Sequence, residues 1–231
     1  QSFVEGQIYA QYPTVQIYRM DDDYVDTRDK YPVKYTAELT LTENEALPIK
    51  TFDNFEVDPL AGITGTLAKL NPDNSEELWI QILTRPIPDS WHKKTDRWIR
   101  KVKSGKRLFG GSSTSGIDWT WVAEALFAFF RPPAGGSGSD APKVELSERA
   151  KTQIAKAEEK ATKLGYEVKI RLSYLGQDQI NAKLNMQALV GTFKQYNSTN
   201  LNGFRLTDGS FKDEALDNYR MRRFTDHGFI L

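Results

Sequence analysis

Residues 47–70 read LPIKTFDNFEVDPLAGITGTLAKL, and this stretch decides how the surrounding chain is arranged. Asp58 followed by Pro59 is typical of a helix start, because aspartate caps the first free amides and proline fits the first helical position. The apolar residues that follow keep helical spacing: Leu60, Ile63, Leu67 and Leu70. We therefore predict an amphipathic helix from Pro59 to Leu70, whose apolar face needs a partner.

This helix is expected to pack on a strand at residues 77–84. That strand is apolar on both faces, which indicates a central position in a sheet. Its apolar residues are Trp79, Ile80, Ile82 and Leu83. Three apolar side chains before the helix are expected to anchor it: Phe52, Phe55 and Val57. Asp89 and Ser90 predict the start of a second helix, from Trp91 to about Lys103.

Strands and helices continue in both directions. Val33 to Leu41 alternates apolar and polar residues and predicts a half-buried strand, whereas residues 1–32 predict an irregular or edge segment with a strand at 14–20. A strand at Val168 to Tyr174 is expected to place Lys169, Arg171 and Ser173 on a solvent-exposed face. The other predicted elements are a helix at 146–164 with Gly165 at its C-terminus, a helix at 178–196, a short strand at 202–206 and a short helix at 211–219.

This order of elements predicts the α+β class, with two similar strand and helix layers of the ferredoxin-like or split α/β kind. A strongly apolar, aromatic-rich helix at 117–130 is expected to lie buried between them, or else to serve assembly or peripheral membrane contact. Residues 132–142 have the composition of a flexible linker or loop. We expect a first module at 1–131 and a second at 143–231, or one continuous domain.

The composition excludes several classes of function. Lys and Arg number 31, as do Asp and Glu, so no overall charge draws the chain to nucleic acid or anionic lipid. The chain has no cysteine, which excludes disulfides and thiol chemistry. Its longest apolar run, 119–130, is shorter than the roughly 20 residues of a membrane span. Because the chain starts without methionine and ends on an apolar Phe-Ile-Leu, we expect a region of a longer protein.

No catalytic, cofactor or metal motif stands out. Ser104-Gly105-Lys106-Arg107 lacks the upstream glycine and the hydroxyl of a phosphate-binding loop. His92 and His227 have no recognisable nucleophile beside them. The three aspartates at 21–23 lack calcium-loop spacing, so a solvated turn is the expected role. We therefore expect no catalytic, cofactor-binding or metal-binding residue in this chain.

The sharpest chemical feature is a basic and aromatic stretch at 91–107. It consists of Trp91, Lys93, Lys94, Arg97, Trp98, Arg100, Lys101, Lys103, Lys106 and Arg107. Cationic side chains pair with phosphates, and tryptophans stack on bases or lie at membrane interfaces. The tryptophans also share one side of a helix, so three interpretations stay open: a core helix with a wet basic face, contact with nucleic acid or lipid headgroups, and protein docking.

Four stretches carry a family resemblance: 47–70, 78–91 (LWIQILTRPIPDSW), 164–174 (LGYEVKIRLSY) and 193–204 (FKQYNSTNLNGF). They resemble the region that precedes the motor domain in TraG- and FtsK-like conjugation ATPases of type IV secretion systems, especially those of candidate-phyla bacteria. The resemblance spans most of the chain, although the loops at 104–116 and 131–142 depart from it. In that family the nucleotide-binding residues would lie beyond Leu231, so no functional residue carries over.

The resemblance implies a non-catalytic accessory or assembly domain of a membrane-associated DNA-transfer ATPase, which positions the motor and mediates protein contacts. Its expected partners are other copies of the parent protein, secretion-channel proteins and DNA. The expected location is the cytoplasm at the inner face of the cell membrane, with membrane contact only through segments outside 1–231. The alternative is a nucleic-acid-binding module that uses the helix at 91–107.

Overall fold

The computed structural model of the chain describes residues 2–71, 73, 75–104 and 146–226. Four strands form one antiparallel sheet in the order β2-β3-β1-β4: β1 (Val33–Leu41), β2 (Glu77–Pro86), β3 (Tyr166–Gly176) and β4 (Phe204–Leu206). Along the chain the elements of the body follow as β1, α2 (Leu60–Leu67), β2, β3, α6 (Gln179–Phe193) and β4. This is the split βαβ, ferredoxin-like arrangement, and the predicted α+β class is confirmed.

The strands of both halves of the chain belong to the same sheet. β2, from the first half, pairs with β3, from the second, along ten residues, from Glu77 opposite Leu175 to Pro86 opposite Tyr166. β3 also pairs with β1, so it lies in the middle of the sheet. The predicted aromatic helix at 117–130 and linker at 132–142 lie outside the described residues.

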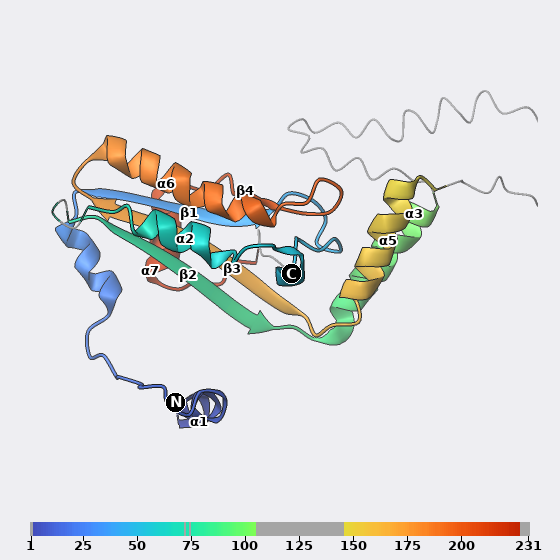
Figure 1. The fold of residues 1–231 in the computed structure, drawn as a ribbon, viewed down its shortest axis with the longest axis horizontal. Coiled ribbons are helices and arrows are strands. Elements are labelled where there is room, and N and C mark those ends of the chain that lie inside the picture. The colour runs from blue at the N-terminus through green and yellow to red at the C-terminus, as the bar shows by residue number, and fades with distance from the viewer. Residues whose placement is uncertain (1, 72, 74, 105–145, 227–231) are drawn as a thin grey trace, which may run out of the picture.

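Helices α2 and α6 lie side by side over one face of the sheet (Figure 1). Asp178 caps α6, because its carboxylate accepts hydrogen bonds from the amides of Ile180 and Asn181. The apolar core lies between these helices and the sheet. It includes Ala37, Leu39, Ile63, Ile170, Leu172, Tyr174, Met186, Leu189, Phe193 and Phe204. The predicted helix at 178–196 is confirmed as α6 followed by the short helix η5 (Lys194–Tyr196).

The opposite face of the sheet is covered too, by α7 (Asp213–Arg220) and the short helix η1 (Tyr24–Lys30). Lys169, Arg171 and Ser173 are fully buried there, so the expectation of a solvent-exposed face on this strand is wrong. The charges tolerate burial because Arg171 donates hydrogen bonds to the carbonyl oxygens of Asn218 and Arg223. Polar alternation along β3 therefore marks an internal hydrogen-bond network.

β2 lies at the edge of the sheet, so the expectation of a central strand is wrong. β2 is apolar on both faces for a reason other than a central position in the sheet. Ile80 packs against the core beneath α2 and α6. On the other face Trp79 meets the rings of Tyr24 and Tyr219, with centroids 4.9 Å and 6.0 Å away. The strand is apolar on both sides because helices cover both sides.

The opening stretch forms its helix where predicted, although the helix is shorter. The carboxylate of Asp58 accepts a hydrogen bond from the amide of Leu60 at 2.8 Å, and α2 ends at Leu67. The expected anchors are only partly correct. Phe52, in the short helix η2 (Phe52–Asn54), and Val57 expose 77% and 72% of their surface, whereas Phe55 is half-buried against Tyr196.

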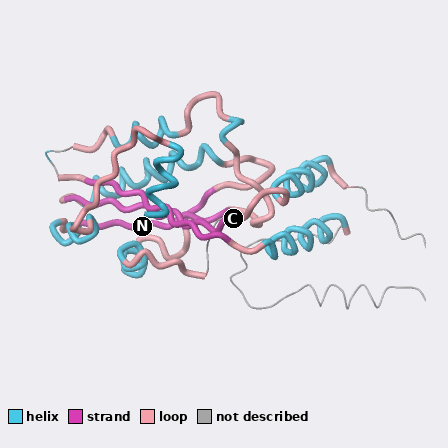
Figure 2. The backbone as a smooth tube through the Cα atoms, turned by 90° about the horizontal axis from the view of Figure 1, so that it is seen from below, coloured by secondary structure: helices cyan, strands magenta, loops and turns pink. Residues whose placement is uncertain are grey.

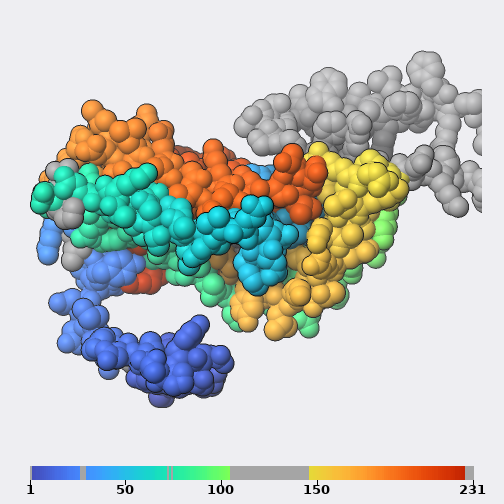
Figure 3. Space-filling model, in the orientation of Figure 1, coloured from blue at the N-terminus to red at the C-terminus, as the bar shows by residue number. Residues whose placement is uncertain are grey.

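The amino-terminal segment differs most from expectation. Residues 2–11 form the helix α1 (Ser2–Gln11), so the expected irregular structure is found only at residues 12–23, and the expected strand at 14–20 is wrong. No residue of α1 is buried, and Figure 3 shows it standing clear of the body. The aspartate turn that follows is tied to the carboxyl-terminal segment, since Asp23 forms a two-pronged ion pair with Arg222 at 2.7 and 2.8 Å.

Candidate nucleic-acid interface

A pair of helices projects from one end of the sheet. After β2, the short helix η4 (Asp89–Trp91) leads into α3 (His92–Lys103), and α5 (Glu148–Lys160) returns to β3. The two helices pack side by side and extend beyond the strands (Figures 1 and 2). We call residues 92–103 and 148–163 the arm. The predicted helices at 91–103 and 146–164 are confirmed as its two halves, and Ser147 caps α5 through a hydrogen bond from the amide of Ala150.

The aromatic side of α3 faces inward. Trp98 and Ile99 pack against Ile154 and Ala157 of α5, together with Ala46 and Leu47 from the body. Trp91 is also buried, beneath Gly165, where an added Cβ would lie 2.5 Å from the indole Nε1. Gly165 is therefore required for this close approach, rather than as the cap of α5, which ends at Lys160. With both indoles buried, any contact with a ligand falls to the cationic side chains.

The outer side of the arm is strongly basic. Six cationic side chains of α3 are exposed to solvent: Lys93, Lys94, Arg97, Arg100, Lys101 and Lys103. Asp96 is the only carboxylate of α3, and residues 148–163 add five cationic residues against three carboxylates. The arm thus carries seven more positive than negative charges, although the whole chain has a net charge of zero. Lys106 and Arg107 lie outside the described residues.

Some of these charges have partners within the chain. Lys94 lies 3.5 Å from the carboxylate of Glu45, and Lys103 lies 3.1 Å from that of Glu158. Lys93, Arg100 and Lys101 form no side-chain ion pair or hydrogen bond with the rest of the described chain. Because exposed ion pairs contribute little and exchange readily with solvent, the outer side of α3 remains open to an anionic partner.

Contacts at its base fix the arm to the body. Lys160 donates a hydrogen bond to the carbonyl oxygen of Glu45 at 2.6 Å, and Gln153 donates to that of Asn200 at 2.8 Å. Burial lowers the pKa of Lys160 to about 8, and the negative charge of Glu45 offsets only part of this effect. The arm is therefore held in a defined position relative to the sheet.

The loops that receive the arm are organised by one buried side chain. The amide oxygen of Asn202 accepts hydrogen bonds from the amides of Glu43 and Gly203. Its amide nitrogen donates to the carbonyl oxygens of Asn44 and Leu47, at 2.9 and 3.0 Å. Asn202 thus joins residues 43–47 to the loop before β4, and both segments contact α5.

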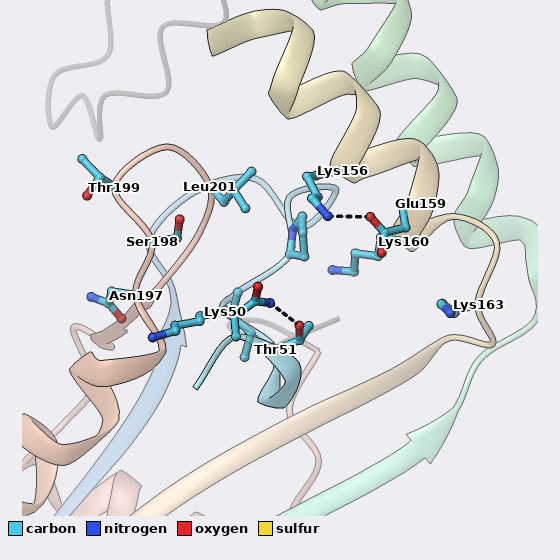
Figure 4. Close-up of a pocket in the computed structure, with 13 residues that line it drawn as sticks. Lys50, Thr51, Lys156, Glu159, Lys160, Lys163, Asn197, Ser198, Thr199 and Leu201 are labelled. Carbon is cyan, nitrogen blue, oxygen red and sulfur yellow. Dashed lines mark hydrogen bonds and ion pairs between the residues drawn. The ribbon is translucent and has the colours of Figure 1, made fainter. Parts of the chain in front are cut away.

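A cavity of about 500 Å³ lies between α5, residues 48–54 and residues 197–201 (Figure 4). Four lysines and one glutamate line it: Lys50, Lys156, Lys160, Lys163 and Glu159. Most of these amines are engaged elsewhere. Lys156 donates to Glu159 at 2.7 Å, which lowers the pKa of that carboxyl, and Lys50 lies over the ring of Phe55. The cavity therefore adds positive charge beside the arm without presenting a convergent anion site.

The described residues contain no group of three or more side chains suited to hold a metal ion. The His92 ring contacts that of Trp91, and its Nε2 lies 3.4 Å from the carbonyl oxygen of Lys163, whereas His227 lies outside the described residues. Within the described ranges, no helix has the length and apolar character needed to cross a bilayer.

Sequence reasoning found α3 but missed the contribution of α5. Lys151, Lys156, Lys160 and Lys163 belong to the same basic region, yet they stand some fifty residues or more after α3 in the chain. The pairing of β2 with β3 brings the two helices together. The available signal was the order of the elements: the strand β2 is followed by the helix α3, and later the helix α5 is followed by the strand β3. This order is typical of two helices that extend from a pair of adjacent strands.

Comparison with known proteins gives one match. A family model described as a domain of unknown function matches residues 1–227. Neither a curated protein nor a solved structure matches the chain.

Proposed function

The chain belongs to that family, DUF8128, and we propose that it is a non-catalytic accessory domain of a membrane-associated DNA-transfer ATPase of the type IV secretion class. In this proposal the arm is the surface that contacts nucleic acid. The observation that supports it most directly is the row of exposed cationic side chains on α3. The aromatic side chains of the same helix point inward, so the cations form its outer surface. The four stretches that resemble conjugation ATPases support the wider setting.

The geometry of α3 suits contact with the phosphate backbone. Its 12 residues span about 18 Å at 1.5 Å per residue. That length matches about five successive phosphates of one strand, at ~3.4 Å each along a duplex. Since the indoles are buried, this contact would depend on charge and show little preference for sequence.

The body of the domain would hold the arm in position. Its sheet and helices fix the base of the arm through Asn202, Lys160 and Gln153. The ATPase motor, other copies of the parent protein and the secretion channel would be its neighbours, at the cytoplasmic side of the cell membrane. Membrane attachment would come from segments outside residues 1–231.

The gene that encodes the chain tests this setting. We expect it to continue beyond Leu231 into a phosphate-binding loop of the Walker type within a few hundred residues. In that parent protein, neutralising Arg97, Arg100 and Lys101 should reduce the stimulation of ATPase activity by DNA and leave the basal activity unchanged. A stop codon directly after Leu231 would contradict the proposal.

A second candidate is docking of the arm onto an acidic protein surface. The burial of both indoles favours it, because single-strand binders usually offer aromatic side chains for stacking. The chain has no cysteine, so a fluorophore on Lys101→Cys would report contact at the arm, and one on Lys212→Cys would serve as a control on another surface. A response to an acidic protein partner but to no oligonucleotide would favour this candidate.

A further inference from the structure

The outer edge of β2 is long, and no other described strand pairs with it. β2 has ten residues and pairs along its whole length with β3, whereas β4, at the opposite edge, has only three. Among the described residues, no main-chain or side-chain group outside the sheet forms a hydrogen bond with the main chain of residues 77–86. A row of unpaired amides and carbonyls of this length is a template for another strand.

Proteins usually protect such an edge with lysine or proline residues within the strand, and the interior of β2 has neither. It contains no lysine, and its only proline, Pro86, is its last residue. Ile82, near the middle of the strand, exposes 60% of its surface. The strand therefore combines free main-chain groups with apolar side chains, which favours pairing with a strand of similar character.

We infer that β2 docks against β2 of a second copy of this chain, antiparallel and around a two-fold axis at Gln81. A two-fold axis perpendicular to the sheet keeps each face continuous across both copies. With the axis at Gln81, Ile80 lies opposite Ile82 of the second copy, and Trp79 lies opposite its Leu83. The paired stretch runs from residue 77 to residue 85 and leaves Pro86 outside.

Charge complementarity selects this register. β2 has two charged residues, Glu77 and Arg85, and the axis at Gln81 places each opposite the other in the second copy. Within one copy, Glu77 accepts hydrogen bonds from Tyr31 and from Trp79 Nε1, and Arg85 pairs with Glu167 of β3 and with Asp226, so the contacts across the axis would add to these. A shift of two residues either way would place both charges opposite uncharged residues or beyond the paired stretch.

The arms do not obstruct this pairing. Each arm leaves the carboxyl end of β2, so two antiparallel copies would carry their arms at opposite ends of an eight-stranded sheet. Because α1 lies on the side of the body that this edge faces (Figures 1 and 3) and has no buried residue, the pairing requires α1 to take another position in the dimer. The proposed function already includes other copies as neighbours; the inference names the surface and register by which two copies meet, and it holds whether or not the arm binds nucleic acid.

The mass of the protein in solution tests the inference. The wild-type chain should sediment as a dimer of 26.3 kDa subunits, with a monomer appearing on dilution. Ile82→Lys should give the monomer, because the lysine would face Ile80 of the second copy across the interface. The matched control is Ile180→Lys, an isoleucine on α6 that exposes 71% and should remain dimeric. Circular dichroism confirms that each variant is folded.

The register has its own test. Glu77→Arg and Arg85→Glu should each dissociate the dimer, since each places like charges opposite one another at both ends of the strand pair. An equimolar mixture of the two variants should form a mixed dimer, in which every pair is again opposite in charge. A wild-type chain that stays monomeric up to its solubility limit, an Ile82→Lys dimer, or a mixture that does not associate would each overturn the inference.

Discussion

Arg171 Nε lies 2.6 Å from the carboxylate of Glu38 on the neighbouring strand, with 1% of the arginine side chain exposed to solvent. The same carboxylate accepts a hydrogen bond from Lys169 Nζ at 2.9 Å. Glu38 therefore faces two buried cations beneath α7. The guanidinium of Arg171 also donates hydrogen bonds to the carbonyl oxygens of Asn218 and Arg223. This cluster therefore binds the carboxyl-terminal segment to the sheet.

Removing the charge of Glu38 should destabilise the fold strongly. Glu38→Gln would leave both cations buried without this carboxylate, and breaking a buried ion pair in this way typically costs about 3–5 kcal/mol. Denaturant unfolding measures the change in free energy of unfolding. Glu56→Gln, at an exposed glutamate, is the control and should change stability by less than about 0.5 kcal/mol. A loss below about 1 kcal/mol for Glu38→Gln would show that the cluster is not a stabilising unit.

Asn202→Ala should loosen the base of the arm. The change leaves the amides and carbonyls of residues 43–47 without their shared partner, and we expect a loss of about 2–4 kcal/mol. Hydrogen exchange at residues 43–47 should accelerate. Asn200→Ala is the control, since only the carbonyl oxygen of Asn200 contacts the arm. Unchanged exchange in the Asn202 variant would contradict the role given to this side chain.

Phe55→Ala should have a moderate effect. The sequence alone leads one to expect roughly 3–5 kcal/mol if the ring is fully buried. The ring is half-buried between Tyr196, 5.1 Å away, and the ammonium group of Lys50 at 4.3 Å. We therefore expect a loss of about 1–2 kcal/mol, measured by thermal unfolding. A loss above about 3 kcal/mol would place Phe55 in the main core after all.

Lys160 should make stability depend on pH. Burial lowers its pKa to about 8, from an ordinary value of 10.5 in the unfolded chain. Between these values the unfolded chain binds more protons than the folded one, so the free energy of unfolding should rise with pH. Lys160→Met should abolish this rise, which amounts to roughly 1–2 kcal/mol between pH ~8 and ~9.5.

The matched control for this pH dependence is Lys156→Met, at an exposed lysine one turn earlier on α5. It should keep the rise in stability. Tyr31 and Tyr174 have pKa values raised to about 12, and their contribution has the opposite sign, because folded tyrosines retain protons that unfolded ones lose above pH ~10. A wild-type stability that falls between pH ~8 and ~9.5 would contradict the assignment to Lys160.

Local pattern was enough to predict most elements of the body and the fold class. Helical spacing and caps identify α2, α5 and α6, because Asp58, Ser147 and Asp178 all bond to the first amides of their helices. The position of β2 was not predictable in this way. An apolar strand indicates coverage on both faces, but coverage comes equally from neighbouring helices and from a central place in the sheet.

The polar face of β3 shows a second limit. Lys169, Arg171 and Ser173 alternate as they would on a solvent-exposed face, and only tertiary structure reveals that α7 covers them. For the same reason the basic residues of α3 were identified from the sequence, whereas those of α5 joined them only through the pairing of β2 with β3. Local sequence encodes chemistry and periodicity, and long-range pairing decides what lies side by side.

Binding of a single-stranded oligonucleotide as a function of salt tests the central claim most directly. The claim is that exposed cations of α3 contact phosphates. The variant neutralises Arg97, Arg100 and Lys101 to glutamine, and the control neutralises the exposed Lys69, Arg205 and Lys212. Both variants lose three positive charges, so they have the same net charge.

We expect the wild-type affinity to fall steeply with salt. The arm variant should bind about 10- to 100-fold more weakly, and the slope of log affinity against log salt should shrink by about two. The control should keep the wild-type slope. Equal slopes for the arm variant and the wild type, or equal losses in both variants, would contradict the assignment of the arm as the contact surface.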